Sequence, residues 1–186
     1  MPLVFLVGGA RSGKSRLAQQ LALQSGGPVT FIATGEPRDE EMEERIGRHR
    51  TERPSTWRTI EESVDLLAAL RSAGAEDCVI VDCLTLWVSN LLNAGRPAAD
   101  VLAMSVECAR QAAERRRATI VVSNEVGLGI VPANELARIY RDVLGSVNSV
   151  FADAASRAAL VVAGRAVELH PLSWSEAGVD GSSARA

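Results

Sequence analysis

The chain has 186 residues, of which 47% are hydrophobic, and this suits one α/β domain with a substantial core. Its formal net charge is -3 and its arginines are interspersed with acids, which argues against a general nucleic-acid binder. No apolar stretch approaches the roughly 18 residues of a membrane span, and no basic region precedes an apolar one at the N-terminus, so no signal peptide is expected either.

The cysteines are three, Cys78, Cys83 and Cys108, and none forms a C-x-x-C pair. An odd number without metal-ligand spacing fits unpaired thiols in a reducing compartment. We therefore expect a cytoplasmic protein.

The first predicted elements are a buried strand over 3–7, a glycine-rich loop, and a helix from Ser15 to Gln24. The loop reads Gly8-Gly9-Ala10-Arg11-Ser12-Gly13-Lys14-Ser15. It matches G-x-x-x-x-G-K-[ST] in the strand–loop–helix context that a phosphate-binding P-loop requires. Glycines 8, 9 and 13 allow positive φ and let backbone N–H groups converge on a phosphate. Lys14 would reach the β- and γ-phosphates, and the Ser15 hydroxyl would join the coordination shell of Mg²⁺.

The alternative is a glycine-rich turn that binds nothing. Lys14 is the only lysine in the chain, so its presence among arginines favours a specific role. We interpret the loop as a nucleotide-binding site.

The second predicted strand, over 29–33, ends in a loop that begins with Thr34 and Gly35. Loops at the carboxyl ends of strands are where open α/β sheets bind ligands. A charged helix is predicted from Asp39 toward His49, with Asp39 as its N-cap. A short strand over 57–60 and a helix over 63–72 follow.

The apolar run 78–82 ends in the carboxylate of Asp82, which is typical of a Walker B strand whose aspartate lies beside Mg²⁺. Alternatively, Asp82 could only cap the next predicted helix, over 84–92.

The remaining predicted elements are a helix over 97–117, a strand over 119–123 and a helix over 133–155 that is interrupted near Gly145. The arginine run 115–117 is predicted to be a solvated helix cap rather than a ligand site. The loop 126–132 carries more aliphatic residues than a turn needs, which indicates a ligand-facing loop.

Two final strands, over 158–163 and 166–169, are too closely connected to be anything but an antiparallel hairpin. Alternation of strands and helices predicts an α/β fold of three layers around a mostly parallel sheet. Residues 1–172 would form one nucleotide-binding and catalytic domain, and residues 173–186 a disordered tail.

His49 lies among four arginines in the segment 45–53. Their cationic field would favour the neutral, nucleophilic imidazole, and their guanidinium groups would neutralise a polyphosphate while a ring nitrogen attacks phosphorus. Alternatively, Met42, Ile46 and His49 share one helical face, and the histidine is then an ordinary core or surface residue.

These features together resemble one family, the bifunctional adenosylcobinamide kinase/adenosylcobinamide-phosphate guanylyltransferases of cobalamin biosynthesis. The resemblance runs from Leu3 to about Glu168 and includes the P-loop with Arg16. It also rests on the segments Ile32-Ala33-Thr34, Asp39 through Pro54, Trp57-Arg58-Thr59, Asp82-Cys83-Leu84-Thr85 and Ser123 through Pro132. The His49 segment and the last segment are more specific than the P-loop, which is generic.

The resemblance implies two reactions and a RecA-like fold. First, the hydroxyl of the aminopropanol arm of adenosylcobinamide takes the γ-phosphoryl group of ATP or GTP. Then a histidine attacks the α-phosphate of GTP, and the guanylylated histidine passes GMP to adenosylcobinamide phosphate. The resemblance also implies a homotrimer with active sites near subunit boundaries.

By the same matching, His49 is the guanylylated histidine and Lys14 the second catalytic residue. The residues that would contact the nucleotide are Gly8, Gly9, Ala10, Arg11, Ser12, Gly13, Lys14, Ser15, Ala33, Thr34, Gly35, Arg50, Thr51, Glu52, Arg53, Glu61 and Asp82. Ser15 and Asp82 would hold Mg²⁺.

The sequence departs from the family pattern at two positions. Some members have two adjacent histidines where this chain has Arg48 and His49, and others have glutamate in place of Asp82. Two other functions stay open from the sequence: a single-activity small-molecule kinase with an inert His49, and a RecA-like ATPase or switch.

Overall fold

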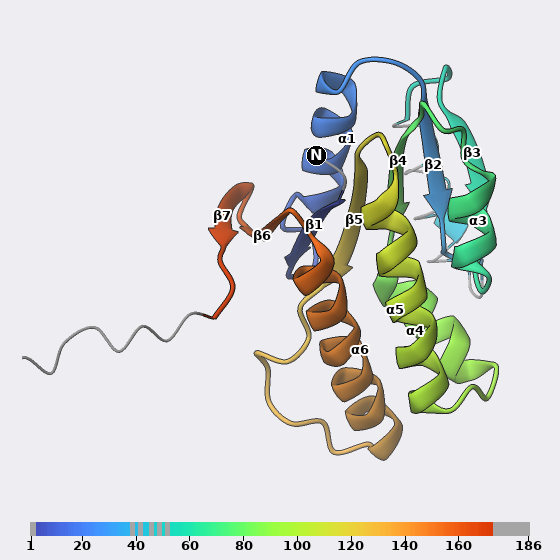
Figure 1. Cartoon of the computed structure of the whole chain (residues 1–186). Helices are drawn as coiled ribbons and strands as arrows, with labels where there is room; N and C mark the ends of the chain where they lie inside the picture. The colour runs from blue at the N-terminus through green and yellow to red at the C-terminus, as the bar shows by residue number, and fades with distance from the viewer. Residues whose placement is uncertain are drawn as a thin grey trace, which may run out of the picture.

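A seven-stranded sheet forms the centre of the molecule (Figure 1). The computed structural model describes residues 3–37, 40, 43–44, 47, 50 and 53–172. The strands are β1 (Leu3–Gly8), β2 (Val29–Ala33), β3 (Arg58–Glu61), β4 (Cys78–Asp82), β5 (Thr119–Asn124), β6 (Arg157–Val162) and β7 (Arg165–Leu169). The helices are α1 (Lys14–Gln24), α3 (Leu66–Ser72), α4 (Leu84–Asn93), α5 (Ala98–Glu114) and α6 (Glu135–Ala154).

The strand order is β3-β2-β4-β5-β1-β6-β7. Each neighbouring pair is parallel except β6 and β7, which form the predicted antiparallel hairpin. The predicted α/β architecture, mostly parallel with a C-terminal hairpin, is therefore confirmed. Because β1, β2, β4 and β5 are parallel, their carboxyl ends meet at one edge of the sheet.

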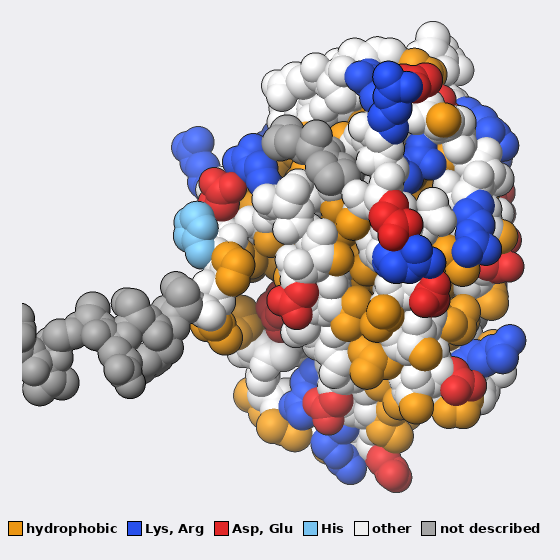
Figure 2. Space-filling model, viewed as in Figure 1, with side chains coloured by type: hydrophobic (Ala, Val, Ile, Leu, Met, Phe, Trp, Pro, Cys, Tyr) orange, Lys and Arg blue, Asp and Glu red, His pale blue; other side chains and the backbone are white. Residues whose placement is uncertain are grey.

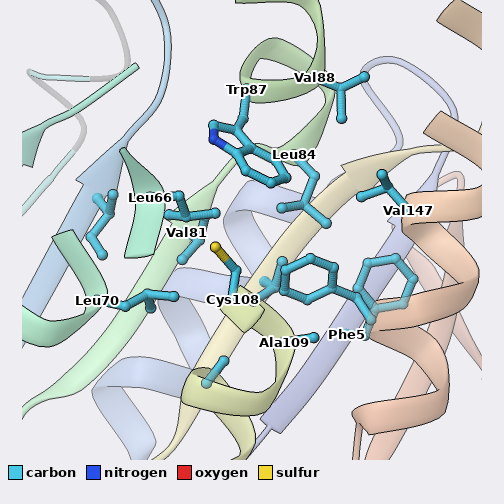
Figure 3. Packing of buried hydrophobic residues seen from close by; sticks show 14 of the residues in the cluster. Phe5, Leu66, Leu70, Val81, Leu84, Trp87, Val88, Cys108, Ala109 and Val147 are labelled. Carbon is cyan, nitrogen blue, oxygen red and sulfur yellow. The ribbon is translucent and has the colours of Figure 1, made fainter. Parts of the chain in front are cut away.

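Apolar side chains on alternate strand positions pack against helices on the two faces of the sheet. Residues of α3, α4, α5 and α6 cover one face, where Trp87 and Phe5 are fully buried (Figure 3). On the other face, Ala18 and Ala22 of α1 pack against Leu6, among other residues. Burial on both faces explains why the central strands are continuous apolar runs rather than alternating ones.

Helix α6 is one uninterrupted helix over Glu135–Ala154, so the interruption predicted near Gly145 is wrong. A single glycine costs a helix only about 1 kcal/mol relative to alanine. The buried side chains of Leu144, Val147 and Phe151 outweigh that cost, since each removes a large apolar surface from water.

The arginine run after α5 is a solvated cap only in part: Arg116 is exposed, as expected, whereas Arg115 and Arg117 bond to backbone carbonyl oxygens. Helix α5 ends at Glu114, and the Arg115 guanidinium donates hydrogen bonds to the carbonyl oxygens of Leu70, Gly74 and Asp77 at 3.2, 2.7 and 3.2 Å. Burial lowers the pKa of Arg115, and the nearby carboxylate of Asp77 partly opposes this shift. Arg115 thus joins the end of α5 to the end of α3 and to the turn before β4, at the edge of the sheet opposite the strands' carboxyl ends.

Buried polar groups fasten the loop after β2 to its neighbours. The Thr34 hydroxyl donates to the Cys83 carbonyl oxygen at 2.7 Å and accepts from the Cys83 N–H at 2.8 Å. The Asn90 side-chain amide donates to the carbonyl oxygens of Thr34 and Ser63 at 2.8 and 3.1 Å. These bonds fix the carboxyl ends of β2 and β4 against each other.

The charged segment before β3 is described only in part. Glu40, Glu43, Glu44, Gly47 and Arg50 have helical backbone, as expected for a helix there. The predicted cap, Asp39, and the predicted tail, 173–186, lie outside the described residues. None of the helices that the structure describes is long and apolar enough to cross a membrane.

Replacing Asn90 by alanine should lower the free energy of unfolding by about 2–4 kcal/mol, because the buried carbonyl oxygen of Thr34 and the partly buried one of Ser63 lose their donor. Urea denaturation measures the change. The matched control is Asn93→Ala on the same helix, where the side chain is exposed and makes only a 3.4 Å contact with Ser89 Oγ, so the change should stay within about 0.5 kcal/mol. Equal effects of the two substitutions would contradict this account of the loop.

Candidate active site

The glycine-rich loop follows β1, which lies between β5 and β6 in the sheet. Its lysine is buried in the loop itself. Lys14 Nζ donates to the carbonyl oxygens of Gly8 and Gly9 at 3.0 and 2.7 Å, and it lies 3.4 Å from Ser12 Oγ. The ammonium group is therefore held at the centre of the loop, where bound phosphates would meet it.

The start of α1 is open to an anion. Gly13 is its N-cap, no side chain caps the first turn, and that turn contains no acidic residue. The first backbone N–H groups of a helix have no partner within it, and the helix dipole adds positive potential there. By contrast, Asp65 and Asn134 cap α3 and α6 through their side chains.

The hairpin of β6 and β7 contacts the backbone of the glycine-rich loop. The N–H of Gly164 donates to the carbonyl oxygen of Ser12 at 2.8 Å. A Cβ on Gly13 would lie 3.4 Å from Gly164 Cα, and a Cβ on Gly8 would lie 2.2 Å from the carbonyl oxygen of Val161. The hairpin therefore sets the backbone path of the loop, and Gly8 tolerates no side chain.

The loop's positive φ angles differ from those expected. Gly8 and Gly13 have positive φ, as predicted, but Gly9 is not among the described glycines that do. Instead, Arg11 adopts the left-handed region at φ 55°. Residues 9–11 are exposed, so this stretch faces solvent and any incoming ligand.

Three strand ends lie side by side at the same edge of the sheet as this loop. Ala33 of β2 is paired in register with Glu61 of β3 on one side and Asp82 of β4 on the other. Strand β4 is two strands away from β1, a lateral distance of about 10 Å. This separation is short enough for a nucleoside triphosphate and its metal to lie between Asp82 and the loop.

Arg53 brings positive charge to the same edge. Its guanidinium carbon lies 3.6 Å from the ring centroid of Phe31, a cation–π contact. Burial lowers the pKa of Arg53, and the charge of Asp82 opposes this shift. Two smaller effects are those of Arg50, which lowers the pKa further, and Glu61, which raises it. Arg53 Nε is buried without a hydrogen-bond partner.

Arg50 and Glu61 form an ion pair with an N···O distance of 2.9 Å, and both side chains are more than half exposed. An exposed pair of this kind adds little stability. Both residues act on the charge of Arg53, as Asp82 does. The structure therefore brings together Arg50, Arg53, Glu61 and Asp82, four residues that the family resemblance had selected.

The environment of Asp82 fits a metal-binding role better than a capping role. Helix α4 has Cys83 as its N-cap and no side-chain cap, which rules out the alternative that Asp82 caps it. Asp82 Oδ2 is buried and has no hydrogen-bond partner, a costly state for a carboxylate that a cation would relieve.

The described residues include no group of three or more His, Cys, Asp and Glu side chains that could hold a metal by themselves. A Mg²⁺ ion here would therefore need the phosphates of a nucleotide, with Ser15 and Asp82 on the protein side. This is how P-loop proteins normally bind it.

Other predicted residues have different surroundings. The hydroxyl of Thr34 is fully buried and already bonded to Cys83, so the side chain fixes the strand ends, and its contact with a nucleotide stays a prediction. Gly35 follows in the half-buried loop. His49, Thr51 and Glu52 lie outside the described residues, and so does Arg48.

Sequence reasoning missed Gly164 as part of the site. The sequence predicted only that a short connection joins the two strands of the hairpin, and no local pattern shows which loop such a connection will contact. Thr85 was also missed: its hydroxyl accepts from the N–H of Asn124 at 2.8 Å, and Asn124 is the residue that pairs with Gly8.

Replacing Gly164 by valine should weaken binding of a non-hydrolysable GTP analogue about tenfold, since a β-branched residue at φ 73° would shift the turn that holds Ser12. Calorimetric titration measures the affinity. The control is Gly95→Val, where φ is 77° and no atom lies within 4 Å of the added Cβ, so backbone strain is matched away from the site. Similar affinities for the two variants would show that the turn does not position the loop.

The chain is similar to curated and solved proteins over most of its length. It is 47% identical to the bifunctional adenosylcobalamin biosynthesis protein CobP of Pseudomonas aeruginosa, over 86% of this chain and 92% of that one. It is 40% identical to CobU of Salmonella typhimurium, over 90% of this chain and 99% of that one. An ATPase of a bacterial type III secretion system shares the fold, with TM-score 0.51 and 12% identity over 86% of this chain and 50% of that chain.

Residues 4–169 match the sequence pattern of a single family, described as cobinamide kinase / cobinamide phosphate guanyltransferase. The match includes the phosphate loop, the strand ends around Asp82 and the hairpin that holds the loop. The chain therefore belongs to the cobinamide kinase / cobinamide phosphate guanyltransferase family.

Proposed function

We propose that this protein phosphorylates adenosylcobinamide with ATP or GTP and then transfers GMP from GTP to adenosylcobinamide phosphate. The observation that carries this proposal is the placement of Lys14 in a phosphate loop at the same sheet edge as the unpartnered carboxylate oxygen of Asp82. Family membership supplies the class of substrate.

In the kinase step, the hydroxyl oxygen of adenosylcobinamide attacks the γ-phosphorus of the nucleotide. The bond from that phosphorus to the bridging oxygen breaks, the nucleoside diphosphate leaves, and the hydroxyl proton passes to solvent. The N–H groups of residues 8–15 and the Lys14 ammonium stabilise the negative charge that develops on the transferred group. When bound between Ser15 and Asp82, Mg²⁺ would neutralise further phosphate charge.

In the second step, a ring nitrogen of His49 attacks the α-phosphorus of GTP and pyrophosphate leaves, so that a nitrogen–phosphorus bond replaces an oxygen–phosphorus bond. A phosphate oxygen of adenosylcobinamide phosphate then attacks the same phosphorus. The bond to His49 breaks, and adenosyl-GDP-cobinamide is released.

The remaining nucleotide contacts belong to the same proposal. Arg50 and Arg53 would neutralise phosphate charge, with Glu61 holding Arg50 in place, and the exposed loop residues Gly9, Ala10 and Arg11 would line the phosphates. Ala33, Thr34, Gly35, Thr51 and Glu52 complete the set carried over from the family.

We also propose a homotrimer in the cytoplasm that has no nucleic-acid partner and no membrane span. The three cysteines are buried and form no disulfide, which supports a reducing compartment, and the net charge of -3 supports the lack of a nucleic-acid partner.

Incubation with GTP labelled at the α-phosphate should leave an acid-labile label on the wild-type protein and on His170→Ala, but none on His49→Ala. His49 and His170 are the only histidines of the chain, so each variant controls for the other. Label remaining on His49→Ala would contradict the assigned nucleophile. Absence of label from the wild type would leave only a single-activity kinase.

Replacing Asp82 by asparagine should raise the Mg²⁺ concentration needed for half-maximal phosphorylation at least about tenfold, because a neutral amide binds the cation poorly. Asp82→Glu keeps the charge and should retain most of the activity. Urea denaturation shows that each variant is folded under the assay conditions. An unchanged Mg²⁺ requirement for Asp82→Asn would exclude this carboxylate as a metal ligand.

A further inference from the structure

The loop between β5 and α6 exposes an unusual number of aliphatic side chains. Leu128, Ile130 and Val131 are 86%, 97% and 62% exposed. Leu136 and Ile139, three residues apart in the first turns of α6, are 57% and 41% exposed. We name these five residues the apolar loop surface. Figure 2 shows hydrophobic side chains along the lower left edge, where this loop runs in Figure 1.

The loop that carries this surface is held at both ends. The N–H of Gly127 donates to the Glu125 side chain, and the Arg138 guanidinium donates to the carbonyl oxygens of Pro132 and Ala133 at 3.0 and 2.6 Å. Asn134 caps the helix that follows, with 3.2 Å to the N–H of Ala137. The aliphatic side chains therefore project from an anchored backbone.

The connection that carries this surface begins beside the phosphate loop. Asn124 of β5 is paired in register with Gly8, and the N–H of Glu125 donates to the Gly8 carbonyl oxygen at 3.1 Å. The same carbonyl oxygen accepts from Lys14. The apolar loop surface therefore lies on a connection that starts beside the phosphate loop, at the same edge of the sheet.

The geometry points to an occupant, and we propose that this surface binds the corrin ring of the cobinamide substrate. This inference rests on the proposed function. A corrin ring is a broad macrocycle whose periphery carries methyl groups beside its amide side chains, and the hydroxyl of cobinamide is carried on a side arm that must reach the γ-phosphate. The ring must then bind at the same edge of the sheet, and an exposed aliphatic patch there matches the methyl-bearing parts of the ring.

A second exposed aliphatic group lies on the hairpin, at Val162, Val167 and Leu169. Strand β7 is an edge strand, and an edge strand offers backbone N–H and C=O groups to another polypeptide. The apolar loop surface offers side chains rather than a strand edge, so it suits a macrocycle better than a second copy of the chain.

The test is equilibrium dialysis of adenosylcobinamide, followed by its visible absorbance, against wild type and the double variant Leu128→Ser/Ile130→Ser. Both side chains are almost fully exposed, so the variant should fold normally. The dissociation constant for adenosylcobinamide should rise about 20-fold, while the affinity for a GTP analogue and labelling by GTP stay unchanged. The matched control, Leu102→Ser/Val106→Ser, alters two exposed aliphatic residues of α5 and should bind like the wild type.

An unchanged dissociation constant for the double variant would overturn the proposal. So would a smaller species in analytical ultracentrifugation, because the surface would then be a contact between copies. Failure of the proposed function would look different: the wild type would bind adenosylcobinamide, weakened as expected in the double variant, yet neither phosphorylate it nor take label from GTP.

Discussion

The site depends on the close approach of two backbone segments, the phosphate loop and the turn between β6 and β7. A Cβ on Gly8 would lie 2.2 Å from the Val161 carbonyl oxygen, and the Gly164 N–H donates to the Ser12 carbonyl oxygen at 2.8 Å. Because the loop is held on one side by its own strand and on the other by this turn, its N–H groups are oriented before any nucleotide binds. Such preorganisation is what makes fixed dipoles effective toward phosphate charge.

The parallel sheet supplies the rest of the site by aligning strand ends. The register places Ala33 between Glu61 and Asp82, and the two hydrogen bonds between Thr34 and Cys83 keep β2 and β4 from shifting. Arg53, stacked on Phe31, adds a cation whose charge lies near Asp82. One edge of the sheet thus carries an anion-binding loop, an unpartnered carboxylate oxygen and positive charge, which is the combination that phosphoryl transfer needs.

Much of this architecture could be predicted because its signals are local. The strands over 29–33 and 78–82 agree with prediction to the residue, since both are short apolar runs ended by turn or polar residues. The P-loop motif likewise combines residue spacing with its flanking elements.

Features that depend on tertiary contacts could not be predicted. Gly145 suggested a break, but packing of its neighbours keeps α6 whole. Arg115 was expected to be solvated, but its guanidinium bonds to the end of α3 and to the turn before β4, about 40 residues away in sequence. The contact of Gly164 with Ser12 joins segments that no periodicity relates.

The central claim is that a triphosphate binds in this loop around the Lys14 ammonium group. Calorimetric titration of Mg²⁺ and a non-hydrolysable GTP analogue into wild type and Lys14→Ala tests it most directly, with urea denaturation confirming that the variant is folded. The account predicts that Lys14→Ala loses at least about tenfold in affinity, because a charge-assisted contact to phosphate is removed. Equal affinities of the folded variant and the wild type would contradict it.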